Sequence, residues 1–274
     1  MIYHYPSLSK HDFLLFRLQG AGLANHLFPM YRAFQKSRQT NGMFLFPPMI
    51  QIKLGTIIRR EHDKRMYTNL FQRRSINEFI KLKVLVSSNK FDESNYELLD
   101  KAKDGVITYE GIEDPSLNEK YYFFKFFDNE FRDDFVNMLT EKTKNRARLS
   151  SELNTIRKDD ICVHIRRGDF PDKLSDEWYI KSINYVAKEF PESQIRIFTD
   201  DISSLGDNIL SIKNISVDSS FNAWHALIKM SAHGTILASK STFAMWSAFI
   251  GNQKVITNSE SDLSKFINNK IQII

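Results

Sequence analysis

The chain has 274 residues, of which 42% are hydrophobic and 26% charged, the proportions of an ordinary globular protein. No stretch reaches about 18 consecutive apolar residues, and no basic segment followed by an apolar one opens the chain, so we expect neither a membrane-spanning helix nor a signal peptide. Cys162 is the only cysteine, which excludes an internal disulfide and a cysteine-based metal site and favours a cytoplasmic setting.

The net charge of +5 is unevenly distributed along the chain. Residues 51–83 carry a local surplus of six positive charges, from nine basic and three acidic residues. The basic residues are Lys53, Arg59, Arg60, Lys64, Arg65, Arg73, Arg74, Lys81 and Lys83. This segment is either a solvated helical face or a surface for an anionic membrane or a phosphorylated acceptor. Nucleic acid is not expected as a partner, because no zinc-finger or aromatic RNA-binding pattern accompanies the charge.

The first half of the chain opens with an apolar run at 13–18, which predicts a strand. A loop with Gly20 and Gly22 follows, and then apolar residues recur at helical spacing up to Gly42, the pattern that opens a nucleotide-binding fold. Further predictions are a strand at 43–46, a short strand at 84–86 and one amphipathic helix over 130–150. The aromatic run at 121–127 is predicted to lie in the core, with an exposed sugar-binding platform as the alternative. A domain boundary is expected near 150, dividing 1–150 from 151–274.

The second half alternates strands and helices. Strands are predicted at 161–166, 194–199, 215–217, 234–239 and, as the last strand, 255–256; helices are predicted at 176–189, 220–232, from 242 onward and 263–269. This alternation predicts an α/β fold with a doubly wound parallel sheet. Polar residues follow three of the strands, at 164–169, 200–201 and 239–243. Because the carboxyl ends of parallel strands lie at one edge, these segments are expected to converge there.

Two adjacent arginines, Arg166 and Arg167, follow the strand that carries His164. Side chains alternate along a strand, so His164 and Arg166 should share one face and Arg167 should lie on the other. A guanidinium matches two phosphate oxygens at once, so the pattern predicts a phosphate or pyrophosphate site. The alternative is a surface turn in which the arginines pair with nearby carboxylates. Those carboxylates are Asp159, Asp160 and Asp169.

Four segments resemble, in the same order, the motifs of the α-1,2-fucosyltransferase family (glycosyltransferase family 11), whose members use GDP-fucose. They are residues 20–28, 164–169, 197–201 and 236–246. The resemblance implies a GT-B-like fold with two Rossmann-like halves around a cleft, the N-terminal half on the acceptor side and the C-terminal half holding the donor. It implies inverting transfer of L-fucose from GDP-fucose to a galactoside hydroxyl, with an α-1,2 linkage, no metal and no cofactor besides the donor substrate.

The resemblance also assigns roles to the motif residues. It places Arg166 on the β-phosphate and Asn25, in the loop that starts at Gly22, close to the sugar and phosphates. Neither Asp200-Asp201 nor Asp133-Asp134 has the spacing of a metal-binding Asp-x-Asp pair, so arginine is the expected cation, with Arg167 second. The other donor-binding candidates are His164, Asp200 and Asp201 at the base and ribose, and Ser241, Thr242 and Phe243 at a helix start. The alternative for Asp201 and Ser241 is a helix N-cap.

The base that takes the acceptor proton is not identified by the sequence. Asp169 is the first candidate by position, with orientation of the arginines as its alternative role, and Asp172, Asp176, Glu177 and His26 follow. The chain has Ala24 and His26 where the family has Gly and Gln, and Ala24 tolerates a positive φ poorly. It also has Lys240, Ala244 and Met245 where Asn, Ser and Trp are usual.

These departures keep two other interpretations open: transfer of another GDP-sugar, and a non-catalytic nucleotide- or glycan-binding module. The presence of both Arg166 and Asn25 argues against the second. The expected acceptor is a lipid-linked, galactose-containing glycan, as in bacterial O-antigen synthesis. The expected location is the cytoplasm, with peripheral contact to the inner membrane through residues 51–83.

Overall fold

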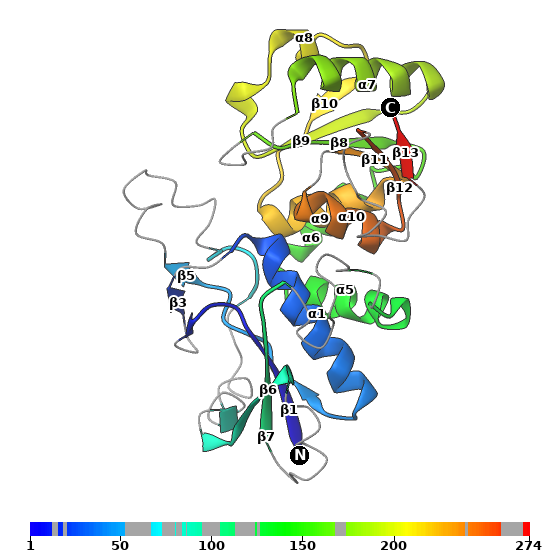
Figure 1. The fold of residues 1–274 in the computed structure, drawn as a ribbon. Coiled ribbons are helices and arrows are strands. Elements are labelled where there is room, and N and C mark those ends of the chain that lie inside the picture. Colours follow the sequence, from blue (N-terminus) through cyan, green and yellow to red (C-terminus); the bar gives the residue numbers. More distant parts are fainter. Residues whose placement is uncertain are drawn as a thin grey trace. The chain divides into compact units, whose positions relative to one another are not determined.

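The computed structural model describes residues 1–12, 16–18, 21–52, 67–72, 80, 84–85, 87–94, 105–112, 124, 127–167, 174–238, 241–258 and 271–274. They form two compact units, Met1–Lys144 and Asn145–Ile274, each built around a parallel sheet (Figure 1). The position near 150 expected for the boundary falls within helix α6 (Arg146–Leu153), which lies wholly in the second unit.

The second unit contains six parallel strands in the order β10-β9-β8-β11-β12-β13 (Figure 1). They are β8 (Ile161–Ile165), β9 (Ile195–Thr199), β10 (Ile215–Val217), β11 (Thr235–Ala238), β12 (Lys254–Thr257) and β13 (Ile271–Ile273). Counted along the chain, this is the 3-2-1-4-5-6 order of dinucleotide-binding folds. The predicted doubly wound parallel sheet is confirmed, but β12 is not the last strand, because β13 extends the sheet beyond it. The helix predicted at 263–269 lies outside the described residues.

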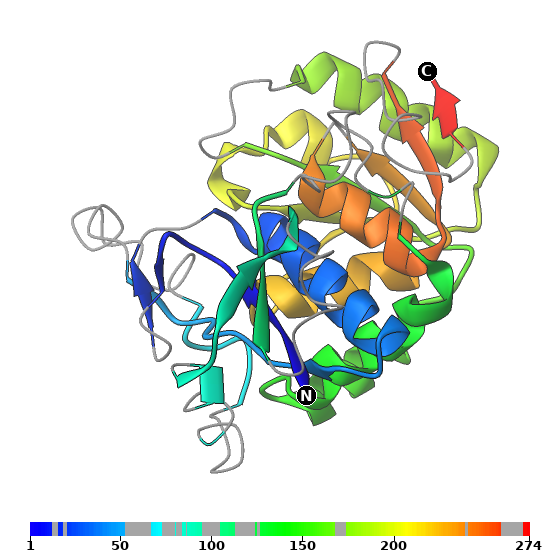
Figure 2. The ribbon, with the colours of Figure 1, turned by 60° about the horizontal axis from the view of Figure 1, so that its bottom comes forward.

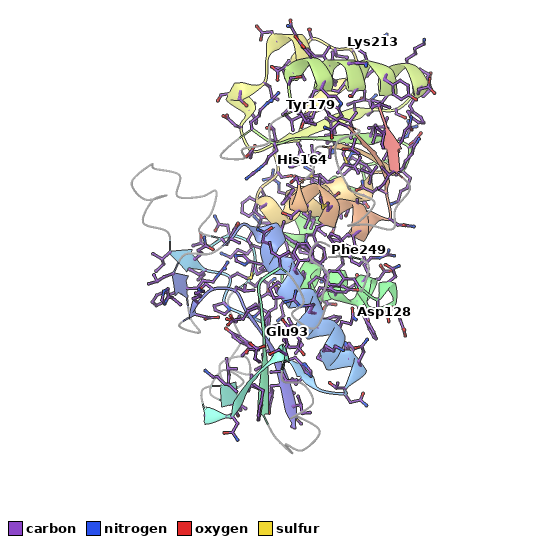
Figure 3. All side chains as sticks on the ribbon, viewed as in Figure 1. Glu93, Asp128, His164, Tyr179, Lys213 and Phe249 are labelled. Carbon is purple, nitrogen blue, oxygen red and sulfur yellow. The ribbon has the colours of Figure 1, made fainter. Side chains whose placement is uncertain are left out.

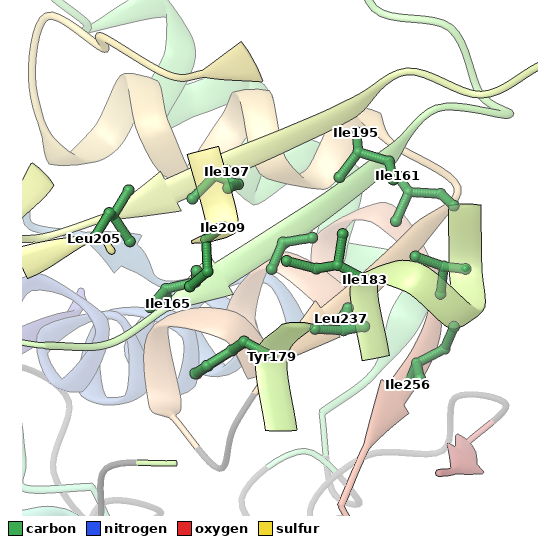
Figure 4. Packing of buried hydrophobic residues seen from close by; sticks show 12 residues of the cluster. Ile161, Ile165, Tyr179, Ile183, Ile195, Ile197, Leu205, Ile209, Leu237 and Ile256 are labelled. Carbon is green, nitrogen blue, oxygen red and sulfur yellow. The ribbon is translucent and has the colours of Figure 1, made fainter. Parts of the chain in front are cut away.

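Helices cover both faces of this sheet. In Figure 1, α7 (Asp176–Glu189) and α8 (Asp207–Leu210) lie on one face, and α6, α9 (Ala223–Ala232) and α10 (Thr242–Gly251) on the other. Successive side chains of β8 contact helices on opposite faces of the sheet. On one face, Ile161, Val163 and Ile165 pack with Tyr179 of α7 in the cluster of Figure 4. On the other face, Cys162 Sγ lies 3.6 Å from the carbonyl oxygen of Met230 in α9. Buried β-branched residues therefore explain why 161–166 was correctly predicted as a strand.

The first unit has four parallel strands in the order β4-β1-β7-β6. They are β1 (Ile2–Ser7), β4 (Met43–Phe44), β6 (Lys90–Asp92) and β7 (Gly105–Glu110). Helix α1 (Leu23–Gln39), predicted from its periodicity, packs against this sheet (Figures 1 and 2). The strand predicted at 13–18 is confirmed at Arg17 and Leu18, which form β3 of a small separate sheet with β2 (His11–Asp12) and β5 (Gln51–Ile52), while residues 13–15 lie outside the described residues. The prediction that this strand opens the nucleotide-binding-like sheet is wrong, because β1 takes that place.

Strand β1 lacks an apolar sequence pattern because one of its core positions is a histidine that distant residues stabilise. His4 is completely buried in it, and both ring nitrogens have partners: the hydroxyl of Tyr109 at 2.7 Å from Nδ1 and that of Thr40 at 2.9 Å from Nε2. Burial, and then the charge of Lys36, lower the pKa of His4 to about 4. A neutral histidine thus fills a core position that an apolar residue would otherwise occupy.

Two further predictions in the first half are corrected. Residues 84 and 85 are helical rather than extended, since the amide of Ser88 donates to the carbonyl of Val84 at 3.0 Å. The single helix over 130–150 is divided into η2 (Asn129–Phe131), α5 (Arg132–Glu141) and α6. The break occurs where Thr143 forms a β-bridge with Phe71 and Asn145 adopts a left-handed conformation with φ 55°.

The aromatic run at 121–127 is described only at Phe124 and Phe127. Phe124 is buried, with its ring centroid 5.2 Å from that of Phe28, and the centroid of Phe127 lies 4.5 Å from that of Tyr31. Both contacts are to α1, and the predicted core role is confirmed for Phe124, whereas Phe127 is only half-buried. Of the helices in the described ranges, none combines the length and apolarity needed to cross a bilayer.

Candidate functional site

The topological switch point of the second sheet lies between β8 and β11, the strands from which the chain proceeds in opposite directions. His164 in β8 pairs with Ala238 in β11 on one side and with Phe198 in β9 on the other. The residues that follow these strands therefore emerge at one edge. Among the described residues, this brings together His164–Arg167, Asp200, Asp201 and the start of α10, as the sequence predicted.

Arg166 is held at this edge by Asp200. Its Nη1 donates to Oδ2 of Asp200 at 2.6 Å, and the other carboxylate oxygen accepts from the backbone amide of Arg167 at 2.8 Å. The side chains of Arg166 and Asp200 are 29% and 23% exposed. One carboxylate thus fixes both the turn after β8 and the guanidinium, which remains open to solvent. The alternative partners predicted for the arginines lie elsewhere: Asp159 pairs with Arg157, and Asp160 accepts from the amide of Gln194.

Arg167 lies on the opposite face and its guanidinium is engaged within the fold. Nη1 donates to the carbonyl of Leu174 at 3.0 Å, Nη2 forms an ion pair with Asp176, and the guanidinium carbon lies 5.4 Å from the ring centroid of Tyr179. The side chain is only 11% exposed. These contacts attach the segment after β8 to the first turn of α7. They also engage Asp176, one of the predicted bases.

His164 is buried on the α10 side of the sheet, opposite Tyr179 (Figure 3). Its ring stacks on Phe243, with centroids 5.6 Å apart and planes inclined by 28°. Burial, and then the charge of Arg166, lower the pKa of His164 to about 4, so the ring is neutral at physiological pH. Among the described residues, its Nδ1 has no hydrogen-bond partner although it is buried. A buried polar atom of this kind suits a ligand that supplies the missing hydrogen bond.

The remaining donor candidates of the second unit lie at two helix starts. Asp201 caps η3 (Ile202–Ser204), accepting from the amide of Ser203 at 3.1 Å, which is the N-cap role considered as its alternative. Ser241 directly precedes α10 and makes no capping bond with its side chain. Thr242 and Phe243 are half-buried in the first turn, where amide groups point toward the same edge as Arg166.

The N-terminal candidates lie at the start of α1. Gly22 is the N-cap, and its carbonyl accepts from the amide of Asn25 at 3.1 Å. Asn25 is half-buried, and Ala24 is helical, so the position does not require a positive φ. His26 is buried and accepts a bond from Arg17, a residue that sequence reasoning missed. The available signal was a lone charge inside the apolar run 13–18.

The other predicted bases and the basic segment are not all described. Asp169 and Asp172 lie outside the described residues, as do all nine basic residues of the segment 51–83, whereas Glu177 is exposed in the first turn of α7. Within the described ranges, no group of three or more His, Cys, Asp or Glu residues is arranged to hold a metal ion.

A parallel sheet in dinucleotide-binding order, with an arginine fixed at its switch point, is the architecture of doubly wound α/β proteins. The sequence matches the profile of the family described as Glycosyl transferase family 11 over residues 32–271, and the chain belongs to this family. The match confirms the family resemblance and, with it, the prediction of a glycosyltransferase; it covers three of the four motifs, while the first, residues 20–28, precedes the matched range. No protein with a curated description matches the sequence significantly.

Solved structures of fucosyltransferases share the fold. The NodZ α-1,6-fucosyltransferase soaked with GDP-fucose has a TM-score of 0.50 at 10% identity, over 97% of this chain and 99% of that one. POFUT1 in complex with GDP has a TM-score of 0.53 at 8% identity, over 92% of this chain and 94% of that one. At this level of identity the likeness concerns the fold, and it confirms the predicted GT-B-like α/β architecture.

Proposed function

We propose that this protein transfers L-fucose from GDP-fucose to a galactoside hydroxyl, with inversion and without a metal. The observation that carries the proposal is Arg166, which Asp200 holds at the switch point with part of its guanidinium exposed. As the sugar departs, negative charge develops on the β-phosphate of GDP, and a fixed guanidinium stabilises it without reorganisation. Arg167 is engaged with Asp176 and Tyr179, so Arg166 takes the phosphate and Arg167 supports the loop.

His164 and the start of α10 complete the proposed donor site. The neutral imidazole of His164, stacked on Phe243, offers its buried Nδ1 to a hydroxyl or base group of the nucleoside. The amides of Thr242 and Phe243 and the hydroxyl of Ser241 supply donors for phosphate oxygens. Asp200 serves the donor through Arg166 rather than by accepting from guanine, and Asp201 shapes the neighbouring turn through its cap of η3.

In the proposed reaction, the acceptor oxygen forms a bond to the anomeric carbon while the bond from that carbon to the β-phosphate oxygen breaks. The acceptor proton passes to a base, for which Asp169 remains our candidate, and GDP leaves with its charge on Arg166. His26 is a poorer candidate than the sequence suggested, because its Nε2 already accepts from Arg17. We assign Asn25 to the reacting sugar on the basis of the family resemblance.

The finer assignments rest on the same resemblance. We propose an α-1,2 linkage to galactose on a lipid-linked glycan of bacterial surface polysaccharide (O-antigen). We also propose that residues 51–83 hold the cytoplasmic enzyme at the inner membrane, supported by their surplus of six charges. The N-terminal unit would then serve the acceptor and the C-terminal unit the donor.

The test is to incubate the protein with GDP-fucose, and separately with GDP-mannose, and a panel of galactosides in excess EDTA. Mass spectrometry should detect a fucosylated galactoside from GDP-fucose alone, and NMR of the product should show an α linkage to the 2-position. A product from GDP-mannose would reassign the donor. Loss of activity in EDTA that Mn²⁺ restores would contradict the metal-free reaction, and absence of any product would contradict the proposed function.

A further inference from the structure

A second arginine–histidine cluster lies in the first unit, at the start of α1. Arg17 is completely buried, and its Nη1 donates to Nε2 of His26 at 2.6 Å, whereas Nδ1 of the same ring lies farther from Nη1, at 3.4 Å. The same guanidinium donates to the carbonyl oxygens of Leu8 at 3.2 Å and Met49 at 3.4 Å. Tyr67 completes the cluster, since its ring centroid lies 6.0 Å from the Arg17 guanidinium carbon and its ring stands edge-on to His26 at 6.3 Å.

This cluster contains a positive charge whose hydrogen-bond acceptors among the described residues are all neutral. Burial lowers the pKa of Arg17 to about 10, against the opposing influence of Tyr67, Asp12 and Tyr5, so the guanidinium is still charged at neutral pH. The carboxylate of Asp12 accepts from the hydroxyl of Tyr5. A charged His26 would place a second cation in contact with the guanidinium, inside the protein. The arrangement therefore requires a neutral imidazole with its lone pair on Nε2 and its proton on Nδ1.

The contact with His26 reaches the first turn of α1. The amides of Asn25 and His26 both donate to the carbonyl of Gly22, at 3.1 and 3.3 Å. Pro29 lies four residues after Asn25 and has no N–H, so the helical hydrogen bond that would end on the Asn25 carbonyl is missing. The His26 side chain, held by Arg17, therefore supplies part of the rigidity that the missing backbone hydrogen bond of α1 would otherwise give.

We propose that Arg17 is a positioning residue for Asn25. It selects the neutral, Nδ1-protonated form of His26 and, through that ring, fixes the turn from which the Asn25 side chain projects. The inference rests on the proposed function, in which Asn25 serves the reacting sugar. It also gives His26 a positioning role in place of the acid–base role that its position in the motif suggested.

The first test measures the tautomer directly. In protein labelled with ¹⁵N-histidine, a long-range ¹H–¹⁵N NMR spectrum at pH 7.5 reports the protonation of each ring nitrogen, and the His26→Gln variant identifies the His26 signals. We expect a protonated Nδ1 and an unprotonated Nε2. A proton on Nε2, or on both nitrogens, would overturn the proposal irrespective of any activity.

The second test compares variants in the transfer reaction. His26→Gln retains an oxygen that accepts from Arg17, so its kcat should stay within about threefold of the wild type. His26→Leu and Arg17→Met break the contact, and kcat should fall at least about tenfold, because small misplacements of a reacting group are costly. The dissociation constant for GDP should stay within about twofold, since the donor residues belong to the second unit.

Arg32→Met is the matched control. Arg32 is another buried arginine, in α1, but it binds Glu93 (labelled in Figure 3) and the carbonyls of Glu110 and Ile112 at the end of β7. It should lower stability while leaving kcat within about threefold of the wild type. If Arg17→Met loses no more kcat than Arg32→Met, the cluster is only structural and the proposal is wrong. If the wild type transfers no fucose at all, the proposed function fails, while the NMR result still decides the state of His26.

Discussion

The two arginine–histidine clusters consist of the same residue types but differ in exposure and in the partners of the arginine. In the second unit, Arg166 has a carboxylate partner and 29% exposure, and His164 retains a buried nitrogen without a partner among the described residues. In the first unit, Arg17 has no exposure and donates through Nη1 and Nη2 to His26 and to two carbonyls, while its Nε has no partner among the described residues. A guanidinium fixed by a carboxylate at an exposed edge can bind an anion, whereas one that is buried and donates to neutral acceptors holds its neighbours in place.

The largest difference between the two clusters is expected when Arg166 is replaced. Arg166→Ala should lower kcat at least about 100-fold, the scale of removing one preorganised donor to a developing charge. Arg166→Lys should restore little, because an ammonium lacks the planar fork. Steady-state kinetics with GDP-fucose, together with thermal unfolding of each variant, checks this. Near-normal turnover in both folded variants would remove Arg166 from the reaction.

Asp200→Asn tests whether the carboxylate acts through Arg166. The amide retains an acceptor oxygen for the Arg167 amide but loses the charge that holds the guanidinium, so we expect kcat to fall roughly tenfold, within the range of losing a charge-assisted hydrogen bond. The double variant with Arg166→Ala should lose no more than Arg166→Ala alone. Asp201→Asn, which retains a side-chain oxygen to cap η3, is the control and should stay near wild-type activity. Additive losses in the double variant would contradict the coupling.

The two buried histidines predict how stability depends on pH. His4 and His164 have pKa values lowered to about 4, whereas an unfolded histidine titrates near 6.5. Between these values the unfolded chain binds more protons, so the free energy of unfolding should be highest above pH 6.5 and fall as the pH decreases toward 4. Each histidine should cost roughly 2 kcal/mol at pH 5.

Urea unfolding at pH 8, 6.5 and 5 measures this dependence. The His4→Gln variant should be less stable than the wild type at pH 8, because Tyr109 and Thr40 lose a well-fitted partner. It should also lose less stability between pH 8 and pH 5. Equal losses in the wild type and the variant would show that His4 does not contribute to the pH dependence.

The smallest effect is expected from the basic segment. Changing Arg59, Arg60, Arg73 and Arg74 to Glu should weaken co-sedimentation with anionic vesicles at low salt, since each basic residue near such a surface contributes about 1 kcal/mol. Activity on a short uncharged galactoside should remain nearly unchanged. A wild type that never binds vesicles, or a variant that binds equally well, would identify the segment as a solvated surface.

The sequence predicts the second unit better than the first, for a physical reason. Strands β8, β9 and β11 are buried on both faces and show apolar runs bounded by turns. Strand β1 contains His4 and Pro6, and it becomes core only because Tyr109, more than 100 residues away, satisfies the histidine. No local sequence pattern indicates such a partner, and β7, which pairs with β1, was also not predicted.

In the candidate site, too, some features follow from local sequence patterns and others depend on tertiary contacts. The positions of His164, Arg166 and Asp200 at strand ends follow from the sequence, because parallel strands end at one edge. The pairing of Arg166 with Asp200 and of Arg167 with Asp176 depends on tertiary placement, and the sequence suggested other carboxylates. Arg17 was missed because its carbonyl partners at Leu8 and Met49 belong to segments without a recognisable pattern.

The central claim is that Arg166 holds the pyrophosphate of the donor, and calorimetric titration with GDP and with guanosine tests it most directly. The wild type should bind GDP much more tightly than guanosine, by at least about 1.5–3 kcal/mol, the contribution of a hydrogen bond to a charged group. Arg166→Ala should bind guanosine as the wild type does and lose most of the preference for GDP. If Arg166→Ala keeps the full preference for GDP, the phosphate is held elsewhere and the account of the site is wrong.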